Sequence, residues 1–157
     1  MYNVIITGSE GLIGSEVSSY LEGKKYNVIR CDLQLGDDLS DESYVKNWFC
    51  NNHADYLINL YAHNPHVEKE MSNKDNSTNL YDISLDSLDY FIKINLTSLF
   101  SVCREFARNN SRGVIVNIYD LKSGSFTRNF TQTCMNSLYN VSLNPKKNLA
   151  ALSRYKS

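Results

Sequence analysis

Short apolar runs alternate with longer amphipathic stretches along the first 120 residues of the chain. Four of the runs are rich in β-branched residues and are bounded by turn-forming residues, at positions 2–7, 27–33, 54–62 and 113–119. Runs of this length and composition are typical of buried strands.

The stretches between these runs place apolar residues at helical spacing. Residues 12–22 form the first stretch, and residues 40–52 form the second, with Ser40 as a candidate N-cap. A third, longer stretch has Asp86 or Ser87 near its cap and continues through REFARNN. Strands that alternate with helices predict an α/β fold, a Rossmann-like three-layer sandwich with a mostly parallel sheet of about five strands.

Two polar segments interrupt this alternation. Residues 63–80 predict a long surface loop, and the pattern weakens again after residue 120, where a final helix can begin at Pro145. No repeat, low-complexity tract or linker divides the chain, so we expect residues 1–157 to form a single domain.

Composition and charge exclude several classes of partner. The 16 Lys and Arg residues balance 17 Asp and Glu residues, and this lack of basic excess argues against nucleic acid. No apolar run has the length of a membrane span, and the N-terminus lacks the features of a signal peptide, so we expect a cytoplasmic protein. The four cysteines form no CxxC pair, which predicts free, mostly buried thiols.

The most informative motif is TGSEGLIG, at residues 7–14, between the first strand and the first helix. This order is the context that a dinucleotide fingerprint requires. The first glycine permits a tight turn, the second lets the backbone approach a pyrophosphate, and the third lets the helix pack close to the strand. The spacing is GxxGxxG rather than the commoner GxGxxG, and the alternative interpretation is a tight turn that binds no ligand.

Asp32 ends the second strand, where a carboxylate can accept hydrogen bonds from both hydroxyls of an adenosine ribose. A carboxylate there repels a 2′-phosphate, so we expect NAD as the cofactor, with NADP less favoured. Glu10 adds negative charge to the loop, whereas Arg30 weakens the argument. The alternative interpretation of Asp32 is a solvated residue at a strand end.

Several segments together resemble the short-chain dehydrogenase/reductase family. In chain order they are TGSEGLIG, Asp32, DDLSD, DYLINLYA, FIKINLTSLFSVCREFA and GVIVNIYD. The resemblance implies a Rossmann fold that uses NAD(P) to oxidise or reduce alcohols and carbonyls. The glycine spacing is similar to the extended, sugar-nucleotide branch, whereas GVIVNI and FIKINLTSLF are similar to the classical branch, so both branches stay open.

The resemblance also implies which residues contact the cofactor. Residues 7–14 match the family's phosphate loop. Asp38 and Leu39 match an Asp-hydrophobic pair that contacts the adenine. Asn59 matches the first Asn of the family's NNAG strand end, although LYA replaces NAG here. The expected cofactor-binding residues are Thr7, Gly8, Gly11, Leu12, Ile13, Gly14, Asp32, Asp38, Leu39 and Asn59.

The family's catalytic pattern is only partly present. Asp120 stands at the position of the serine that polarises the substrate oxygen, and an ionised carboxylate cannot donate a hydrogen bond. Ser123 and Ser125 follow closely and can substitute for it if the loop is rerouted. Asn95 matches the helix Asn that helps to order a proton-relay water in the family.

The family's YxxxK motif is also altered. It needs a lysine four residues after the tyrosine, because the ammonium group lowers the pKa of the phenol. One alignment places Tyr139 at the tyrosine, with Leu143 at the lysine, and the other places Lys147 at the lysine, with Leu143 at the tyrosine. Pro145 lies between them, so one helix cannot bring them together in the usual way. The expected catalytic residues are Asn95, Tyr139 and Lys147.

Three further expectations complete the picture. Members of the family run on well past residue 157, so the resemblance implies a C-terminally truncated chain whose substrate pocket is largely absent. His63 and His66 have no third ligand, so we expect no metal. The helix around Asn95 builds a dimer interface in the family, which leaves a homodimer open.

The function that follows is a short-chain-type, NAD(P)-dependent oxidoreductase that acts on the carbonyl or alcohol of an unidentified small molecule, such as a sugar derivative. Two alternatives stay open. A non-catalytic dinucleotide-binding or oligomerising remnant, that is a pseudoenzyme, is favoured by the altered Ser and YxxxK positions. A fragment similar to a sugar-nucleotide epimerase or dehydratase is favoured by the glycine spacing.

Overall fold

A computed structural model describes residues 1–63 and 84–118 of the chain. The described residues contain four parallel strands, in the spatial order β2-β1-β3-β4. They are β1 (Asn3–Thr7), β2 (Asn27–Cys31), β3 (Tyr56–Asn59) and β4 (Val114–Asn117). Each lies within a run that the sequence pattern predicts as a strand, and a fifth strand would fall outside the described residues.

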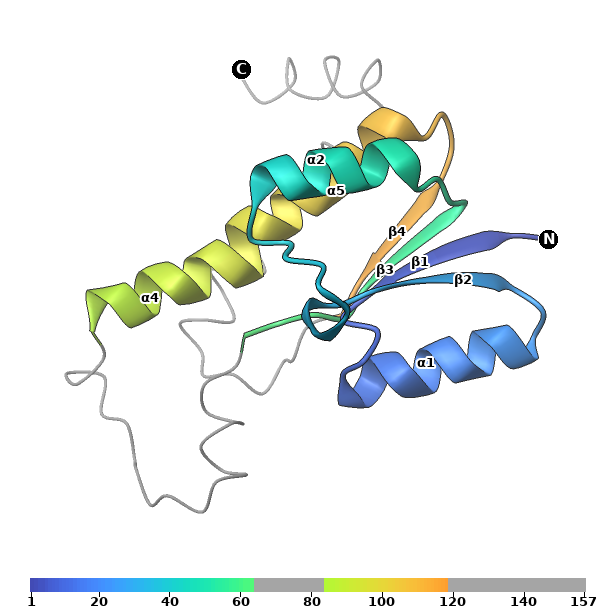
Figure 1. Cartoon of the computed structure of the whole chain (residues 1–157), viewed down its shortest axis with the longest axis horizontal. Helices are drawn as coiled ribbons and strands as arrows, with labels where there is room; N and C mark the ends of the chain where they lie inside the picture. The colour runs from blue at the N-terminus through green and yellow to red at the C-terminus, as the bar shows by residue number, and fades with distance from the viewer. Residues whose placement is uncertain (64–83, 119–157) are drawn as a thin grey trace, which may run out of the picture.

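Helices cover both faces of this sheet (Figure 1). Helix α1 (Leu12–Gly23) lies on one face, and α2 (Glu42–Asn51) and α5 (Leu99–Asn109) lie together on the other. Helix α4 (Leu85–Ile92) continues into α5 through η3, a π-helical segment at Lys93–Ser98. The arrangement confirms the predicted α/β three-layer architecture.

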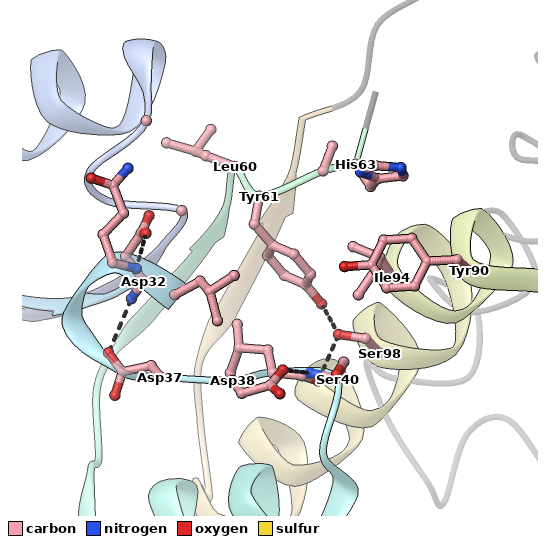
Figure 2. Close-up of a pocket in the computed structure, with 16 residues that line it drawn as sticks. Asp32, Asp37, Asp38, Ser40, Leu60, Tyr61, His63, Tyr90, Ile94 and Ser98 are labelled. Atoms are coloured by element: carbon pink, nitrogen blue, oxygen red, sulfur yellow. Dashed lines mark hydrogen bonds between the residues drawn. The ribbon is translucent and has the colours of Figure 1, made fainter. Parts of the chain in front are cut away.

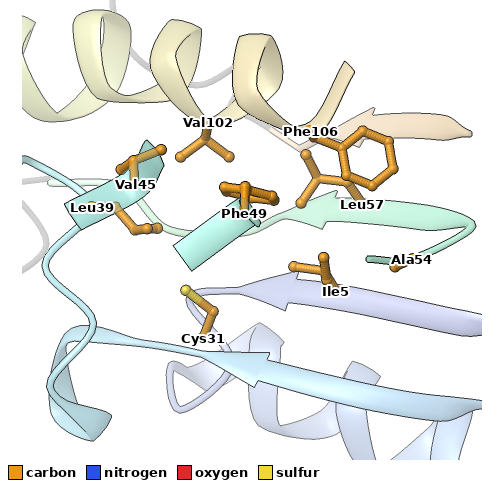
Figure 3. Close-up of a cluster of buried hydrophobic side chains, with 9 residues drawn as sticks. All are labelled: Ile5, Cys31, Leu39, Val45, Phe49, Ala54, Leu57, Val102 and Phe106. Atoms are coloured by element: carbon orange, nitrogen blue, oxygen red, sulfur yellow. The ribbon is translucent and has the colours of Figure 1, made fainter. Parts of the chain in front are cut away.

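The hydrophobic core lies between the sheet and the α2/α5 layer (Figure 3). Its buried members are Ile5, Cys31, Leu39, Val45, Phe49, Ala54, Leu57, Val102 and Phe106. The rings of Phe49 and Phe106 meet edge to face with centroids 6.4 Å apart, so α2 and α5 interlock through aromatic side chains. Phe49 is fully buried, and Trp48 is half-buried against it.

Helix α2 begins one position later than the sequence predicts. Asp41 is the N-cap, and its carboxylate accepts hydrogen bonds from the backbone N–H groups of Ser43 and Tyr44. The predicted cap, Ser40, instead donates its own backbone N–H to the Asp38 carboxylate. Ser40 therefore belongs to the turn before the helix, because a side chain two residues earlier already engages its backbone.

Helix α4 begins earlier than the sequence predicts. Ser84 is its N-cap and accepts a hydrogen bond from the backbone N–H of Ser87 at 3.2 Å. Asp86 and Ser87 therefore lie in the first turn rather than at the cap. A hydroxyl that accepts the N–H three residues on is the ordinary capping geometry, and serine and aspartate suit it about equally, so the sequence alone did not distinguish them.

Helix α1 contacts the sheet through small residues. Its buried positions are Gly14 and Ser18, whereas Leu12, Ile13 and Tyr20 are exposed. The helical spacing correctly predicts the helix, but its largest apolar side chains do not mark the face that packs. Small residues let the helix axis approach the sheet closely, and that close approach determines the buried face.

Candidate cofactor-binding site

A cavity of about 360 Å³ opens at the carboxyl ends of β1, β2 and β3 (Figure 2). Four segments form its wall: the first glycines of the turn after β1, the loop after β2, the segment after β3, and the helix that runs from α4 into η3. The lining residues are Gly8, Gly11, Asp32, Leu33, Gln34, Asp37, Asp38, Leu39, Ser40, Leu60, Tyr61, Ala62, His63, Tyr90, Ile94 and Ser98. Open α/β sheets bind ligands at this edge, where the strand order reverses.

Two glycines of the turn are required by close backbone contacts. Gly8 has a positive φ of 71°, and a Cβ there would lie 2.6 Å from the backbone nitrogen of Tyr61. A Cβ on Gly14 would lie only 1.9 Å from the carbonyl oxygen of Gly8. The predicted roles of the first and third glycines, in the tight turn and in close helix packing, therefore have a direct geometric basis.

The N-terminus of α1 has neither a side-chain cap nor an acidic residue in its first turn. Its N-cap is Gly11, which lines the cavity. By contrast, Asp41 caps α2 and Ser84 caps α4 through side-chain hydrogen bonds. The first N–H groups of a helix have no partner within the helix, and together they carry a positive partial charge. This helix end therefore fits a bound phosphate or pyrophosphate.

Asp32 links the glycine turn to the loop after β2. It is 8% exposed, and its two carboxylate oxygens accept hydrogen bonds from the backbone nitrogens of Glu10, at 3.0 Å, and Gln34, at 2.9 Å. A carboxylate has about four acceptor positions, so about two of them remain for further hydrogen bonds. The side chain is thus held in place while it can still accept hydrogen bonds from a ligand.

Two further carboxylates surround the same end of the cavity. Asp37 accepts hydrogen bonds from the backbone N–H of Asp32 and from the hydroxyl of Tyr44, and the latter bond raises the pKa of Tyr44 to about 12. Hydrogen bonds from Ser40 lower the pKa of the Asp38 carboxyl, which keeps it ionised. Together with Asp32, they make this end of the cavity strongly negative.

Arg30, on β2, forms ion pairs with two glutamates. Its guanidinium contacts Glu10 at 3.2 Å and Glu22 at 3.1 Å. The hydrogen bond to Glu10 is the main reason that the pKa of Arg30 is raised. Arg30 does not line the cavity, and the described lining residues include no Lys or Arg.

Five of the predicted cofactor residues lie outside the cavity wall. Thr7 and Asn59 are buried beneath it, where the Thr7 hydroxyl donates to the Asn59 side-chain oxygen at 2.8 Å. The Asn59 amide then donates to Asn117 at 2.7 Å, so one polar chain joins the ends of β1, β3 and β4. Leu12 and Ile13 are exposed on α1. Gly14 is buried behind the turn.

Asn95 lies in the π-helical segment, next to Ile94, which lines the cavity. Its side-chain oxygen accepts the backbone N–H of His63, and its side-chain nitrogen donates to the backbone carbonyl of His63, both at 2.8 Å. The His63 ring in turn packs edge to face on Tyr90. π-helical turns are often found at functional sites, and here the turn presents Asn95 to the chain that leaves β3.

Sequence reasoning did not select Tyr61, although its side chain stands in the cavity (Figure 2). The hydroxyl of Tyr61 lies 2.8 Å from the Ser98 hydroxyl, which donates to the backbone carbonyl of Leu39, also at 2.8 Å. Burial raises the pKa of Tyr61 well above its usual value, so the hydroxyl remains a donor. The sequence LYA, in place of the family's NAG, puts the large residue Tyr61 where the family has a small one. This difference did not show that the side chain enters the cavity.

Several predicted residues fall outside the described part of the chain. These are Tyr139 and Lys147, together with Asp120, Ser123, Ser125 and His66.

Among residues 1–63 and 84–118, no group of three or more His, Cys, Asp or Glu side chains is arranged to hold a metal ion. No helix within those ranges is both long enough and apolar enough to cross a membrane.

The cysteines of the described region are free thiols. Cys31 and Cys103 are buried, as predicted, whereas Cys50 on α2 is exposed. Burial raises the pKa of Cys103 to about 11 and raises that of Cys31 further above its usual value. The two buried thiols are therefore poor nucleophiles at neutral pH.

The fold resembles several solved structures. A small-chain dehydrogenase in complex with NADPH has a TM-score of 0.68 and 18% identity, over 89% of this chain and 63% of that one. A second small-chain dehydrogenase has a TM-score of 0.66 and 17% identity, over 89% and 72% of the two chains. The dTDP-4-dehydrorhamnose reductase of Clostridium acetobutylicum has a TM-score of 0.62 and 19% identity, over 90% and 50%.

At these identities the structural matches establish the fold. The chain spans half of the reductase and less than two thirds of the NADPH-bound dehydrogenase. A comparison with curated protein sequences finds no match. The model of the NAD-dependent epimerase/dehydratase family matches residues 4–117, which include the glycine turn and the four described strands except for the first residue of β1. The chain therefore belongs to the NAD-dependent epimerase/dehydratase family and has the Rossmann-like fold of the short-chain dehydrogenases.

Proposed function

We propose that this chain binds NAD, with the pyrophosphate at the N-terminus of α1 and the adenosine ribose at Asp32. The observation that carries the proposal is the uncapped start of α1, which meets the same cavity as a fixed carboxylate at the end of β2. The first feature favours a phosphate and the second favours a pair of ribose hydroxyls, so their combination fits a dinucleotide.

The choice of NAD over NADP follows from the charge around the ribose. A 2′-phosphate would stand beside Asp32 and near Asp37 and Asp38, and like charges at short range repel. Arg30, the cation beside the glycine turn, already contacts Glu10 and Glu22, so releasing it for a 2′-phosphate would break both ion pairs. NADPH bound to a similar dehydrogenase supports a nicotinamide dinucleotide in general, and the carboxylates favour the form without the phosphate.

Calorimetric titration with NAD, and separately with NADP, tests this proposal. We expect NAD to bind more tightly than NADP, and Asp32→Ala to weaken NAD by roughly tenfold or more, because hydrogen bonds to a charged group are worth about 1.5–3 kcal/mol. Asp55→Ala is the matched control, because Asp55 accepts a hydrogen bond from Asn3 at the opposite edge of the sheet. Binding of neither dinucleotide, or equal binding by Asp32→Ala and wild type, would refute the proposal.

We further propose oxidoreductase chemistry for the complete site. The bound nicotinamide would accept or donate hydride at its C4 atom. Tyr139 would move the proton of the substrate oxygen, and Lys147 would lower the pKa of that tyrosine. Asn95 would hold a water that connects them to solvent. A screen of alcohols with NAD, followed by absorbance of reduced nicotinamide, tests this step, and Tyr139→Phe should abolish any turnover while NAD binding is retained.

A second candidate is an epimerase or dehydratase reaction on a sugar nucleotide, and the family match to residues 4–117 favours it. In such a reaction the hydride returns to the product, so no reduced nicotinamide accumulates. Product analysis of sugar nucleotides incubated with the protein and NAD distinguishes the two candidates. Tight NAD binding without turnover in either assay would support the non-catalytic alternative, which the aspartate at position 120 favours.

A further inference from the structure

Tyr61 is fixed at both ends. Its backbone nitrogen lies so close to Gly8 that a Cβ on Gly8 would approach it to 2.6 Å. At the other end, the Ser98 hydroxyl has one hydrogen and donates it to the Leu39 carbonyl, so Tyr61 must be the donor in its contact with Ser98. The position of the aromatic ring is therefore set before any ligand arrives.

The ring also stands at a defined end of the cavity. Ser98, to which its hydroxyl connects, lies beside Asp38 and Ser40, across the cavity from Asp32 (Figure 2). Leu39 and Ile94 add apolar surface to the cavity wall. If the pyrophosphate lies at α1 and the ribose at Asp32, the base of the dinucleotide reaches this end.

The hydroxyl of Tyr61 already donates its proton to Ser98, so the largest surface that the side chain offers a ligand is the flat face of its ring. Burial favours the neutral phenol, and its single proton is committed to Ser98. An aromatic face without a free polar group recognises a flat, apolar surface such as a nucleobase. Because the ring is fixed in advance, stacking costs little side-chain entropy.

We propose that Tyr61 is the residue on which the adenine base stacks, and that Ser98 is a positioning residue that holds its ring. This inference rests on the proposed dinucleotide site. It assigns recognition of the base to a side chain from the segment after β3, in addition to the loop after β2. Base–aromatic stacking typically changes affinity by roughly fivefold to more than a hundredfold when the aromatic residue is replaced by alanine.

Competition against NAD measures this contribution with two ligands, AMP and ribose 5-phosphate. The ratio of their dissociation constants reports the base alone, because both carry the ribose and the phosphate. We expect Tyr61→Ala and Tyr61→Leu to reduce the preference for AMP by roughly tenfold. Tyr61→Phe retains the ring but loses its hydrogen bond to Ser98, so the preference for AMP should fall by less than in Tyr61→Leu. Tyr20→Ala is the matched control, since Tyr20 is exposed on α1 away from the cavity.

Tyr61→Leu retains an apolar side chain of substantial size, so it keeps the test informative if the alanine variant does not fold. If wild type binds neither NAD nor AMP, the proposed function fails and this inference fails with it. If wild type binds NAD but Tyr61→Leu keeps the full preference for AMP, only this inference is overturned. Tighter AMP binding by Tyr61→Leu would also overturn it, because the ring would then obstruct the base rather than support it.

Discussion

Replacing Gly14 with alanine tests the close contact between α1 and the turn after β1. The added methyl carbon would lie 1.9 Å from the carbonyl oxygen of Gly8 and 2.9 Å from the Cα of Ser9. These are backbone atoms, so no side chain can rotate away to make room. The first turn of α1 would have to move from β1 by about 1 Å or more before the contact becomes acceptable.

The magnitude follows from two opposing effects. Inserting a methyl group into a packed contact costs about 1–3 kcal/mol, whereas alanine gains up to about 1 kcal/mol over glycine within a helix. We expect a net loss of about 1–2 kcal/mol in the free energy of unfolding. NAD affinity should also fall, by roughly tenfold or more, because the shift moves the N–H groups at the start of α1 away from the pyrophosphate.

Urea denaturation of Gly14→Ala and Gly23→Ala, each with an NAD titration, provides the assay. Gly23 is the last residue of the same helix, and a Cβ there meets nothing within 4 Å. Gly23→Ala should therefore be neutral or stabilising by up to about 1 kcal/mol, with unchanged NAD binding. Equal stability and equal NAD affinity of the two variants would refute the argument that Gly14 is required by the approach of the helix.

Two further predictions concern titratable groups. The hydrogen bond to Asp37 raises the pKa of Tyr44 to about 12, whereas the usual pKa of tyrosine is about 10. This bond therefore stabilises the fold fully below about pH 10, and its contribution is lost as the pH rises toward 12. The stability difference between wild type and Tyr44→Phe, from urea denaturation, should shrink between pH 10 and pH 12, and a constant difference would contradict this. Iodoacetamide at pH 8 should alkylate Cys50, which is exposed, much faster than Cys31 and Cys103, whose buried thiols have raised pKa values. Mass analysis of the peptides measures the alkylation rate of each cysteine. Alkylation of Cys31 and Cys103 as fast as Cys50 would contradict the burial of these two thiols.

The regular part of this fold could be predicted from the sequence because it depends on local patterns. Apolar runs of four to five residues form strands wherever both faces of a sheet are covered, and the helical spacing between them is a property of neighbouring residues. The glycine turn could also be predicted, since a strand, a glycine and a helix in that order leave few possible backbone paths. The helix caps were less certain, because several neighbouring Ser and Asp residues suit the role.

The wall of the candidate site depended on contacts between residues distant in the chain. Whether Asn59 faces the cavity or the interior was decided by Thr7 and Asn117, which lie on neighbouring strands and bond to it beneath the cavity. Tyr61 enters the cavity because Ser98, 37 residues away, accepts its hydroxyl.

By itself, the sequence determined the strand and helix order, the glycine turn and the carboxylate at the end of β2, because each depends on residues close together in the chain. Only the tertiary structure decided that α1 packs through Gly14 and Ser18, and that the side chain of Tyr61 stands in the cavity. The physical reason is that the buried face of a helix and the direction of a side chain depend on close packing and on partners supplied by other elements.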